Sequence, residues 1–460
     1  MKTVNDSMRW KTVFRSILCV LLSWACLPIS SGWAADATAL AANASSKVFN
    51  VREFGAKGDG KTLDTAAIQK ALDECGKTGG TVQFPPGTYL SQPIVLHSST
   101  TLKLDAGAVL QATGDQLAFL KSGTNWLAAK FSDFIPFIGG KDLTDVTITG
   151  GGMIDGAGAN WWGPAEAARR KTPGYTLPRP RLIIITGCKN LLVSDVTLQN
   201  GPCMHLVPTD CENVIISNVT VQSPAHSPNT DAIDPTNCKN MLITKCRLDV
   251  GDDDVAIKAN HNVDGRDFSC EDITVTDCTF LHGHGMSIGS ETSAGVHNVL
   301  VTNCTFQDTE NGIRIKSDRR RGGLVENIHY TDITMKNVDP AITLTCYYMN
   351  NSSGDPTKLS PPKVDPAQAK TERTPIFRNI YFNNVNATCS ESAGIIIGLP
   401  ESAISNVVLE NVQIAAATTG LSVKNAKGIQ FKNVQITNKE GPPLLTEDAE
   451  VLGWKDPAQK

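Results

Sequence analysis

The sequence predicts an all-β protein, a single-stranded right-handed parallel β-helix solenoid with one capping helix near its N-terminus. Three observations predict it. A short phrase of alternating apolar residues recurs through much of the 460-residue chain. No helical pattern separates the copies, so the repeating unit is built of strands. One amphipathic helical pattern precedes the copies, where it is suited to cover the open end of a stack.

Each copy of the phrase begins with Asn or Asp, continues with alternating apolar residues and ends in a small polar turn. The clear copies start at Asn190, Asn213, Asn240, Asp272, Asn298 and Asn327, with weaker ones at Asn379, Asn406 and Gly428. The clear starts are 23, 27, 32, 26 and 29 residues apart, and periods in this range are typical of solenoids. Asn at a fixed place suits a turn whose side chains share hydrogen bonds from coil to coil. A propeller or a sandwich would need closely spaced hairpin turns, which are scarce here.

The capping helix is predicted from Asp64 onward. Asp64 or Thr65 is suited to be its N-cap, and Gly76 to be its stop. Four residues at helical spacing form one apolar face: Ile68, Ala71, Leu72 and Cys75.

Residues 1–35 are typical of a secretory signal peptide. Cationic residues between Lys2 and Arg15 precede the apolar run 17–22, and small residues end at Ala34 and Ala35, where we expect cleavage. The alternative is a membrane anchor, but this run is too short to span a bilayer and no later stretch is longer. We therefore expect an exported protein, secreted or periplasmic, with no membrane partner.

The rest of the chain divides by composition and by the repeats. Residues 36–47 predict a disordered leader, residues 48–440 one β-helix domain, and residues 441–460 a C-terminal tail or cap. The formal net charge of -4 and the lack of a basic stripe argue against a nucleic-acid partner. We expect a monomer.

Of the 13 cysteines, Cys19 and Cys26 lie in the signal peptide, which leaves an odd number. Several of the others recur in one local context, among them Cys238, Cys246 and Cys278. This pattern favours small buried residues at one structural position over paired bridges. A few disulfides stay open in an oxidising compartment.

A run of three acids, Asp252 to Asp254, leads straight into the apolar strand pattern 255–257. Short strands of successive units align through an inward apolar column: Ile233, Val255, Met286 and Ile313. The residues two positions earlier are Asp231, Asp253, His284 and Asn311. Parallel strands on successive coils lie about 4.8 Å apart. We therefore expect Asp231, Asp253 and His284 to form a ladder.

Asp252 would lie beside this ladder, on a bend that Gly251 permits. On the next coil Arg314 and Lys316 flank inward isoleucines, so we expect both cations to point outward on the same groove. Carboxylates this close cannot all ionise with ordinary pKa values, and at least one pKa should be raised. Glycosidic hydrolysis needs one protonated carboxyl and one carboxylate that activates water. The two cations would suit an anionic sugar.

Each feature alone has a simpler interpretation. Asp252 to Asp254 resembles a solvated loop or a calcium site, His284 a surface residue, and Arg314 with Lys316 a solvated face. Their position on consecutive coils in one register favours a shared site.

At these residues the chain resembles glycoside hydrolase family 28, the polygalacturonase-like pectin hydrolases. The family's four signatures occur in order: Asn229-Thr230-Asp231, Gly251-Asp252-Asp253, Gly283-His284-Gly285 and Arg314-Ile315-Lys316. Upstream, Ile154 to Gly158, Trp161-Trp162 and Arg179-Pro180 are similar to the family's entry segment. The resemblance covers roughly residues 48–440.

The resemblance implies an inverting glycosidase that cleaves α-1,4-galacturonosidic bonds in pectin, with no metal and no cofactor. Asp252 would be the general acid, Asp231 with Asp253 would position and deprotonate the attacking water, and His284 would tune the acid. The residues implied to bind substrate are Arg314, Lys316, Asn229 and Tyr348, with Tyr347 as the alternative to Tyr348. The implied partner is an acidic plant polysaccharide such as pectin, polygalacturonate or its oligosaccharides.

Two departures from the family pattern are Ala232, where Gly is usual, and Asp254, where Cys is common. Asp254 adds a charge next to the acid and removes a disulfide partner. Three alternatives stay open: a rhamnogalacturonan or xylogalacturonan hydrolase, a calcium-dependent pectate lyase, and a non-catalytic polysaccharide-binding β-helix. The sequence leaves exo or endo action open.

Overall fold

The computed structural model describes residues 47–121, 128–172, 175–260, 269–348 and 365–455. The predicted signal peptide and the predicted leader up to residue 46 lie outside the described residues.

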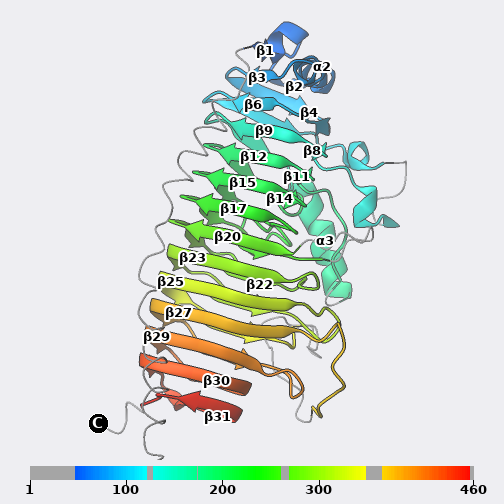
Figure 1. Ribbon diagram of the computed structural model, residues 1–460. Helices are drawn as coiled ribbons and strands as arrows, with labels where there is room; N and C mark the ends of the chain where they lie inside the picture. Colours follow the sequence, from blue (N-terminus) through cyan, green and yellow to red (C-terminus); the bar gives the residue numbers. More distant parts are fainter. Residues whose placement is uncertain (1–46, 122–127, 173–174, 261–268, 349–364, 456–460) are drawn as a thin grey trace, which may run out of the picture. The chain divides into compact units, whose positions relative to one another are not determined.

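Strands dominate this part of the chain, and every pairing between named strands is parallel (Figure 1). An antiparallel bridge joins Leu120 and Phe134, outside the strands. Strands of successive coils lie over one another in three ladders. This arrangement, mostly parallel with few helices, is that of a parallel β-helix and agrees with the predicted all-β class.

The first ladder consists of β1 (Val48–Asn50), β3 (Gly80–Phe84), β6 (Thr100–Leu104), β9 (Thr144–Thr149), β12 (Lys189–Ser194), β15 (Glu212–Ser217), β17 (Lys239–Thr244) and β20 (Cys270–Thr276). The second consists of β2 (Asp59–Leu63), β4 (Gly87–Ser91), β7 (Ala108–Ala112), β10 (Met153–Asp155), β13 (Thr197–Gln199), β16 (Thr220–Gln222), β18 (Arg247–Asp249) and β21 (Thr279–Leu281). Longer strands then continue both ladders: β23 (Val296–Gln307), β25 (Leu324–Val338), β27 (Ile376–Cys389) and β29 (Ile404–Ala416).

The third ladder carries the residues of interest. It consists of β5 (Ile94–Val95), β8 (Ile138–Lys141), β11 (Ile183–Thr186), β14 (Leu206–Thr209), β19 (Val255–Ile257), β22 (Met286–Gly289), β24 (Ile313–Lys316), β26 (Ile342–Thr345) and β28 (Gly394–Ile397). Between β14 and β19 the ladder is continued by single bridges from Ile233 to Leu206 and to Val255.

The predicted asparagine turn is confirmed. Asn213 has φ 58°, in the left-handed region, and its side-chain amide donates to Asn190 Oδ1 at 3.0 Å. Asn240 donates in turn to Asn213 Oδ1 at 2.7 Å. The same side-chain contact continues at Asn298, Asn327, Asn379 and Asn406. Asn tolerates this backbone region better than most residues, and the stacked amides satisfy one another along the coils.

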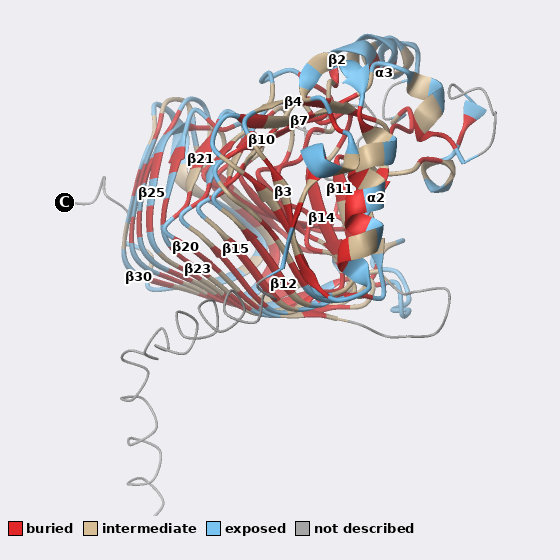
Figure 2. Ribbon diagram, turned by 90° about the horizontal axis from the view of Figure 1, so that it is seen from above, coloured by how far each residue is buried: buried red, intermediate tan, exposed pale blue. Residues whose placement is uncertain are grey.

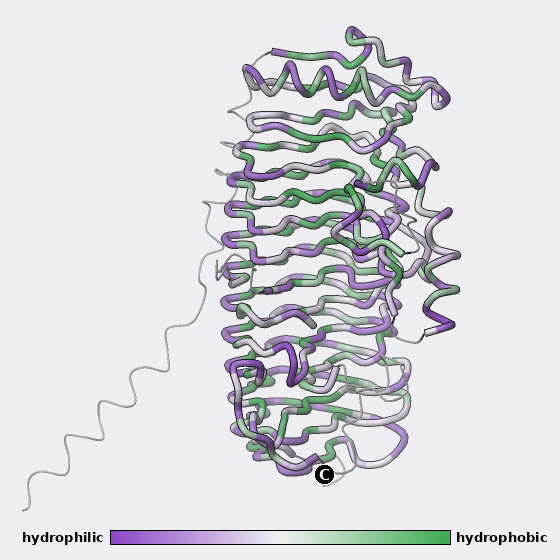
Figure 3. Tube along the Cα trace, turned by 90° about the vertical axis from the view of Figure 1, so that its right-hand side faces the viewer, coloured by the Kyte–Doolittle hydropathy of each residue, from purple (hydrophilic) through white to green (hydrophobic). Residues whose placement is uncertain are grey.

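The core lies inside the coils, because alternate residues of each strand point inward. Figure 2 shows the buried residues following the strands, and Figure 3 shows hydrophobic and hydrophilic residues alternating along each coil. The cysteines from Cys75 to Cys389 are all free thiols and all buried, so no disulfide joins residues in the described part. The preference for buried repeated cysteines over bridges is confirmed there.

The predicted helix is α2 (Thr65–Gly76), and its four apolar residues are buried. Asp64 is the N-cap by position, but its carboxylate accepts instead from the backbone of Lys57 and Gly58, at 2.7 and 2.9 Å. The helix contacts β1 and β3. That it closes the end of the stack stays a prediction. The other helices among the described residues are α3 (Ala159–Lys171) and the 3-10 turns η1 (Val51–Phe54), η2 (Gln116–Phe119) and η4 (Phe131–Asp133).

At the other end the strands continue beyond the predicted boundary at residue 440. β31 (Glu440–Leu452) pairs in parallel with β30 (Thr419–Thr437), and Trp454 packs on Phe431 with ring centroids 5.6 Å apart. Proline at 442 and 443 does not prevent this pairing, because the strand lies at the edge of the sheet. No helix in the described part of the chain is long and apolar enough to cross a membrane.

Candidate active site

The predicted inward column on the third ladder is confirmed. Ile233 pairs with Val255, Val255 with Met286, and Met286 with Ile313, and all four side chains are buried. This register brings the segments that precede the four residues together on successive coils. Acidic and cationic side chains of these segments lie near one another.

Asp252 and Asp253 lie on the bend before β19, as expected. The reason for Gly251 differs from the prediction, because its backbone is not in the left-handed region. A Cβ there would lie 2.3 Å from the Ser227 carbonyl oxygen. Glycine is needed because the preceding coil approaches closely.

Asp253 is held by two cations. Lys316 Nζ lies 2.7 Å from its Oδ2, and the Arg314 guanidinium pairs with its Oδ1. Ser287 Oγ donates to the same Oδ1 at 2.9 Å and accepts from Arg314 Nε at 3.0 Å. Burial alone would raise the pKa of Asp253, but the two cations outweigh it and lower that pKa to about 2.

Arg314 and Lys316 point away from the core, as predicted, but neither side chain is solvated. The exposed fraction of each of these two side chains is 4%, and that of the Asp253 side chain is 3%. The oppositely charged side chains of Asp253, Arg314 and Lys316 are in contact and shield one another from water. They form a packed ion cluster instead of an open face.

Asp252 is the more accessible acid. His284 Nδ1 lies 3.0 Å from its Oδ1, and the two side chains keep 20% and 18% of their exposure. Burial would raise the pKa of Asp252 and lower that of His284. Their mutual attraction outweighs burial, holding the pKa of Asp252 well below its usual range and raising that of His284 to about 10. His284 Nε2 lies 2.9 Å from Glu310 Oε2.

Asp231 lies in a different setting. Its Oδ2 is 3.3 Å from Lys258 Nζ, which is also 2.5 Å from Asp234 Oδ1. Burial and the neighbouring Asp234 raise the pKa of Asp231 well above its ordinary value, although Lys258 opposes them. The expectation that one clustered carboxyl has a raised pKa agrees with this direction.

Asn229 links two coils of the site. Its amide donates to Asp252 Oδ2 at 3.4 Å, and its Oδ1 accepts from Arg179 Nη2 at 2.9 Å. Arg179 is fully buried, and its Nε and Nη1 have no hydrogen-bond partner among the described residues. Asn229 adopts φ 53°, which suits Asn.

Tyr348, rather than Tyr347, reaches the cluster. Lys316 Nζ lies 4.9 Å from the centre of the Tyr348 ring. The Tyr347 hydroxyl instead donates to Asp365, and Arg319 stacks over its ring.

Asp254 does not add the expected charge beside the acid. Its side chain is fully buried, accepts from the Gly285 amide at 3.0 Å, and leaves Oδ1 without a partner among the described residues. Burial raises the pKa of Asp254 well above its ordinary value, which favours the neutral acid.

The sequence analysis missed four polar residues of the site: Asp234, Lys258, Ser287 and Glu310. Each had a positional signal in the predicted register. Asp234 and Lys258 follow the inward residues Ile233 and Ile257, Ser287 follows Met286, and Glu310 precedes Asn311.

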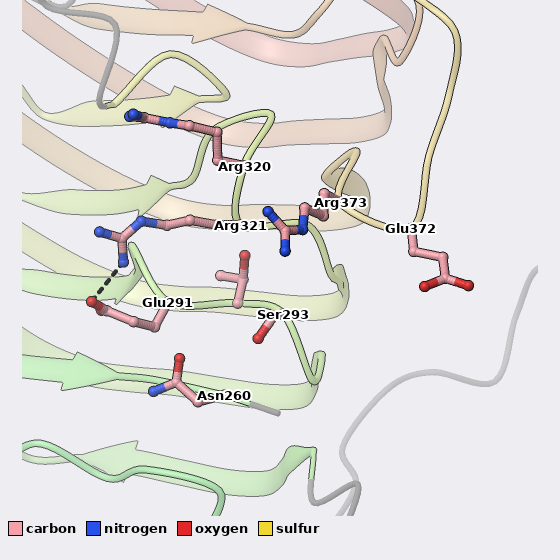
Figure 4. Close-up of a pocket in the computed structure, with 8 residues that line it drawn as sticks. Asn260, Glu291, Ser293, Arg320, Arg321, Glu372 and Arg373 are labelled. Atoms are coloured by element: carbon pink, nitrogen blue, oxygen red, sulfur yellow. Dashed lines mark ion pairs between the residues drawn. The ribbon is translucent and has the colours of Figure 1, made fainter. Parts of the chain in front are cut away.

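A hollow of about 470 Å³ lies beyond the C-terminal ends of β19, β22 and β24, lined by charged residues (Figure 4). Arginines of the 319–321 run contribute to it, but each already has acidic partners. Arg321 pairs with Glu291 at 2.6 Å, Arg320 with Asp318 at 3.1 Å, and Arg319 with Asp365 and Glu401. These pairs favour a structural role for the run over extra binding of a polyanion.

Oxygen or nitrogen atoms of Asp252, Asp253 and His284 lie within 4.8 Å of one another. The donor set does not suit a cation, because Arg314 and Lys316 occupy the oxygens of Asp253 and the acidic neighbours of His284 raise its pKa, which favours its protonated form. The cluster is better described as an ion-pair network.

Comparisons with known proteins agree with this geometry. The family model described as Glycosyl hydrolases family 28 matches residues 78–430. An endo-polygalacturonase of Pectobacterium carotovorum subsp. carotovorum is 31% identical over 395 residues, which cover 83% of this chain and 89% of the relative.

Two solved structures are also similar. A hyperthermoactive exopolygalacturonase from Thermotoga maritima is 26% identical with a TM-score of 0.65, covering 91% of this chain and 96% of that one. A polygalacturonase from Erwinia carotovora ssp. carotovora is 27% identical with a TM-score of 0.63, covering 89% and 97%. Since the family model spans most of the chain and its site residues share one register, the chain belongs to glycosyl hydrolases family 28 and is a glycosidase.

Proposed function

We propose that this glycosidase hydrolyses α-1,4-galacturonosidic bonds of polygalacturonate, inverting the anomeric centre by acid–base catalysis between carboxyl groups. The observation that carries the proposal is the cluster of Asp231, Asp252 and Asp253 on adjacent coils, with Arg314 and Lys316 against it. The names of the relatives, endo- and exopolygalacturonases, support the substrate.

Asp252 is the proposed general acid, because it is the most accessible of the three carboxyls. In the free enzyme its proton is held by the adjacent His284, 3.0 Å away. The pair therefore stores one proton at the place where the leaving oxygen would be protonated. His284, fixed from its other side by Glu310, is the proposed proton-tuning residue.

Asp231 is the proposed base for water, assisted by Asp253. Both oxygens of Asp253 already accept from cations, which makes it a weak proton acceptor. Asp231 Oδ1 has no hydrogen-bond partner among the described residues and is the more basic oxygen. Asp253 then serves mainly to fix Arg314 and Lys316.

The proposed substrate-binding residues are Arg314, Lys316, Asn229 and Tyr348. A galacturonate carboxylate would share the two cations with Asp253, and the Tyr348 ring beside Lys316 offers an apolar face to a sugar. The proposed partner is pectin, polygalacturonate or its oligosaccharides.

Polygalacturonate digestion in the presence of a chelator tests the proposal. We expect new reducing ends without a rise in ultraviolet absorbance, and loss of that activity in Asp252→Asn. A calcium-dependent lyase would instead give unsaturated, absorbing products and would stop in chelator. A purely binding protein would retain polygalacturonate with Asp252→Asn unchanged, and a rhamnogalacturonan or xylogalacturonan hydrolase would release ends only from those polymers.

We also propose that residues 1–35 direct export and are removed, that residues 36–47 form a leader, and that the mature protein is a monomer. The coils wind right-handedly, as strand twist favours, and α2 covers their N-terminal end. N-terminal sequencing and the sedimentation coefficient of the secreted protein test the first three.

A further inference from the structure

Lys258 occupies a partly buried position between two carboxyl groups. It directly follows β19, and its Nζ lies 2.5 Å from Asp234 Oδ1 and 3.3 Å from Asp231 Oδ2. The exposed fractions of the three side chains are 15% for Lys258, 1% for Asp234 and 5% for Asp231. Asp231 and Asp234 lie on the coil next to that of Lys258, Asp252 and Asp253, since Ala232 N donates to the Asp253 carbonyl oxygen at 2.9 Å.

The charges of this group do not balance. One ammonium faces two carboxyls, and Asp231 Oδ1 and Asp234 Oδ2 have no hydrogen-bond partner among the described residues. A buried carboxylate without compensation is unfavourable, so the two acids compete for the charge of one lysine. Whether Asp231 is ionised therefore depends on the charges of Lys258 and Asp234.

Other charged groups face Asp231 from the neighbouring coils. Asp252 and Asp253, on the bend before β19, disfavour a further negative charge. The ring of His205 lies 3.0 Å from the Asp231 carbonyl oxygen, and burial lowers the pKa of His205 to about 4, which favours the neutral ring. Glu291 also attracts Lys258, and Arg321 pairs with Glu291 at 2.6 Å (Figure 4).

We infer that Lys258 and Asp234 are positioning residues with opposite effects on Asp231: Lys258 favours its charged carboxylate and Asp234 disfavours it. The inference rests on the proposed function, in which Asp231 takes the proton of the attacking water. In this inference neither Lys258 nor Asp234 contacts the substrate. Together they set the pH range in which Asp231 is ionised and can act as the base.

The effects of substitution have opposite signs. Lys258→Met removes the attraction that lowers the pKa of Asp231, so that pKa rises further. Asp234→Asn removes the repulsion that raises it and leaves Lys258 to Asp231 alone, so the pKa falls. A nearby charge shifts a carboxyl pKa by about 1 to 3 units, which is a change of about 10-fold or more in proton affinity.

The experiment is the pH profile of kcat/KM on polygalacturonate for the wild type, Lys258→Met, Asp234→Asn and Lys258→Arg. We expect the acidic limb to move to higher pH in Lys258→Met and to lower pH in Asp234→Asn, and to stay near the wild type in Lys258→Arg. Lys239→Met is the matched control, since Lys239 pairs with Glu271 at 2.6 Å on the neighbouring β17, away from Asp231.

A purely structural role for Lys258 would lower kcat/KM equally at all pH values, and unmoved limbs in both variants would overturn the inference. If the basic limb moves instead, Lys258 does act on the pKa of Asp231. Asp231 would then be the catalytic acid, which contradicts its proposed role as the base. If Lys258→Met does not fold, the carboxyl ¹³C NMR titration of Asp231 in wild type and Asp234→Asn measures the same shift. A wild type that releases no reducing ends would refute the proposed function, while this titration would still test the inference.

Discussion

Asp252→Asn should change the protonation of His284 more than any other property of the site. In the wild type, His284 loses solvation on burial, which lowers its pKa, but Asp252 at 3.0 Å outweighs this and raises the pKa to about 10. Without that charge, burial is opposed only by the pairing with exposed Glu310 and by Asp253, whose Oδ1 lies 4.0 Å from His284 Nδ1. We expect the pKa of His284 to fall by at least about 2 units, within the range that a close opposite charge produces.

The change also affects stability with a defined sign. Because the pKa of His284 is raised on folding from 6.5 to about 10, its contribution is fully present below pH 6.5 and is lost as pH rises through about 10. One pKa unit corresponds to about 1.4 kcal/mol, so the contribution is on the order of a few kcal/mol. Asp252→Asn should therefore flatten the fall of stability between these pH values.

The assay is an NMR titration of the histidine Cε1 protons from pH 5 to 11, with His284→Gln to assign the signal among the eight histidines. Asp249→Asn is the matched control, because it breaks a similar 2.9 Å pair with His282 whose side chains keep 52% and 34% of their exposure. Water screens that exposed pair, so this variant should leave the titration of His284 unchanged. A wild-type His284 that titrates near 6.5, or one that Asp252→Asn leaves unchanged, would refute the reasoning.

Four further outcomes are expected. Asp253→Asn leaves Arg314 and Lys316 buried without their carboxylate and should lower the free energy of unfolding by about 3–5 kcal/mol in urea titrations, whereas Glu74→Gln, at an exposed pair that water screens, should change it far less. Because the pKa of Asp253 is lowered to about 2, its wild-type contribution should persist above the unfolded pKa and be lost only as pH falls through about 2; a loss near pH 5 would contradict the ion cluster. Asn213→Ala should be less stable than Asn213→Gly by about 1 kcal/mol, because both lose the side-chain ladder but only alanine is strained at φ 58°; equal stabilities would contradict this account of the turn. A thiol reductant should leave the thermal midpoint unchanged, since Cys278 and its stacked neighbours are free thiols, and a lowered midpoint would reveal a bridge.

The sequence predicted the fold because its local and periodic signals agree. The phrase that begins at Asn213 contains both the alternation of a strand and the residue that its left-handed turn requires. The same alternation set the register of Ile233, Val255 and Met286, and that register alone brought Asp231, Asp253 and His284 together.

Burial of the site could not be predicted in the same way. Alternation shows which side chains leave the core, but not what covers them afterwards. Arg314 and Lys316 leave the core as predicted, yet pairing with Asp253 removes them from water. Lys258 was missed because a lysine after an apolar strand ordinarily reaches solvent. Only the folded structure shows that Asp231 and Asp234 lie beside it.

The stereochemistry of cleavage tests the central claim most directly. Polygalacturonate is digested while ¹H NMR follows the anomeric protons of the new reducing ends before they equilibrate. If Asp252 protonates the leaving oxygen while Asp231 activates water from the opposite side, the β-anomer forms first. An initial α-anomer, or an unsaturated end in its place, would contradict the account.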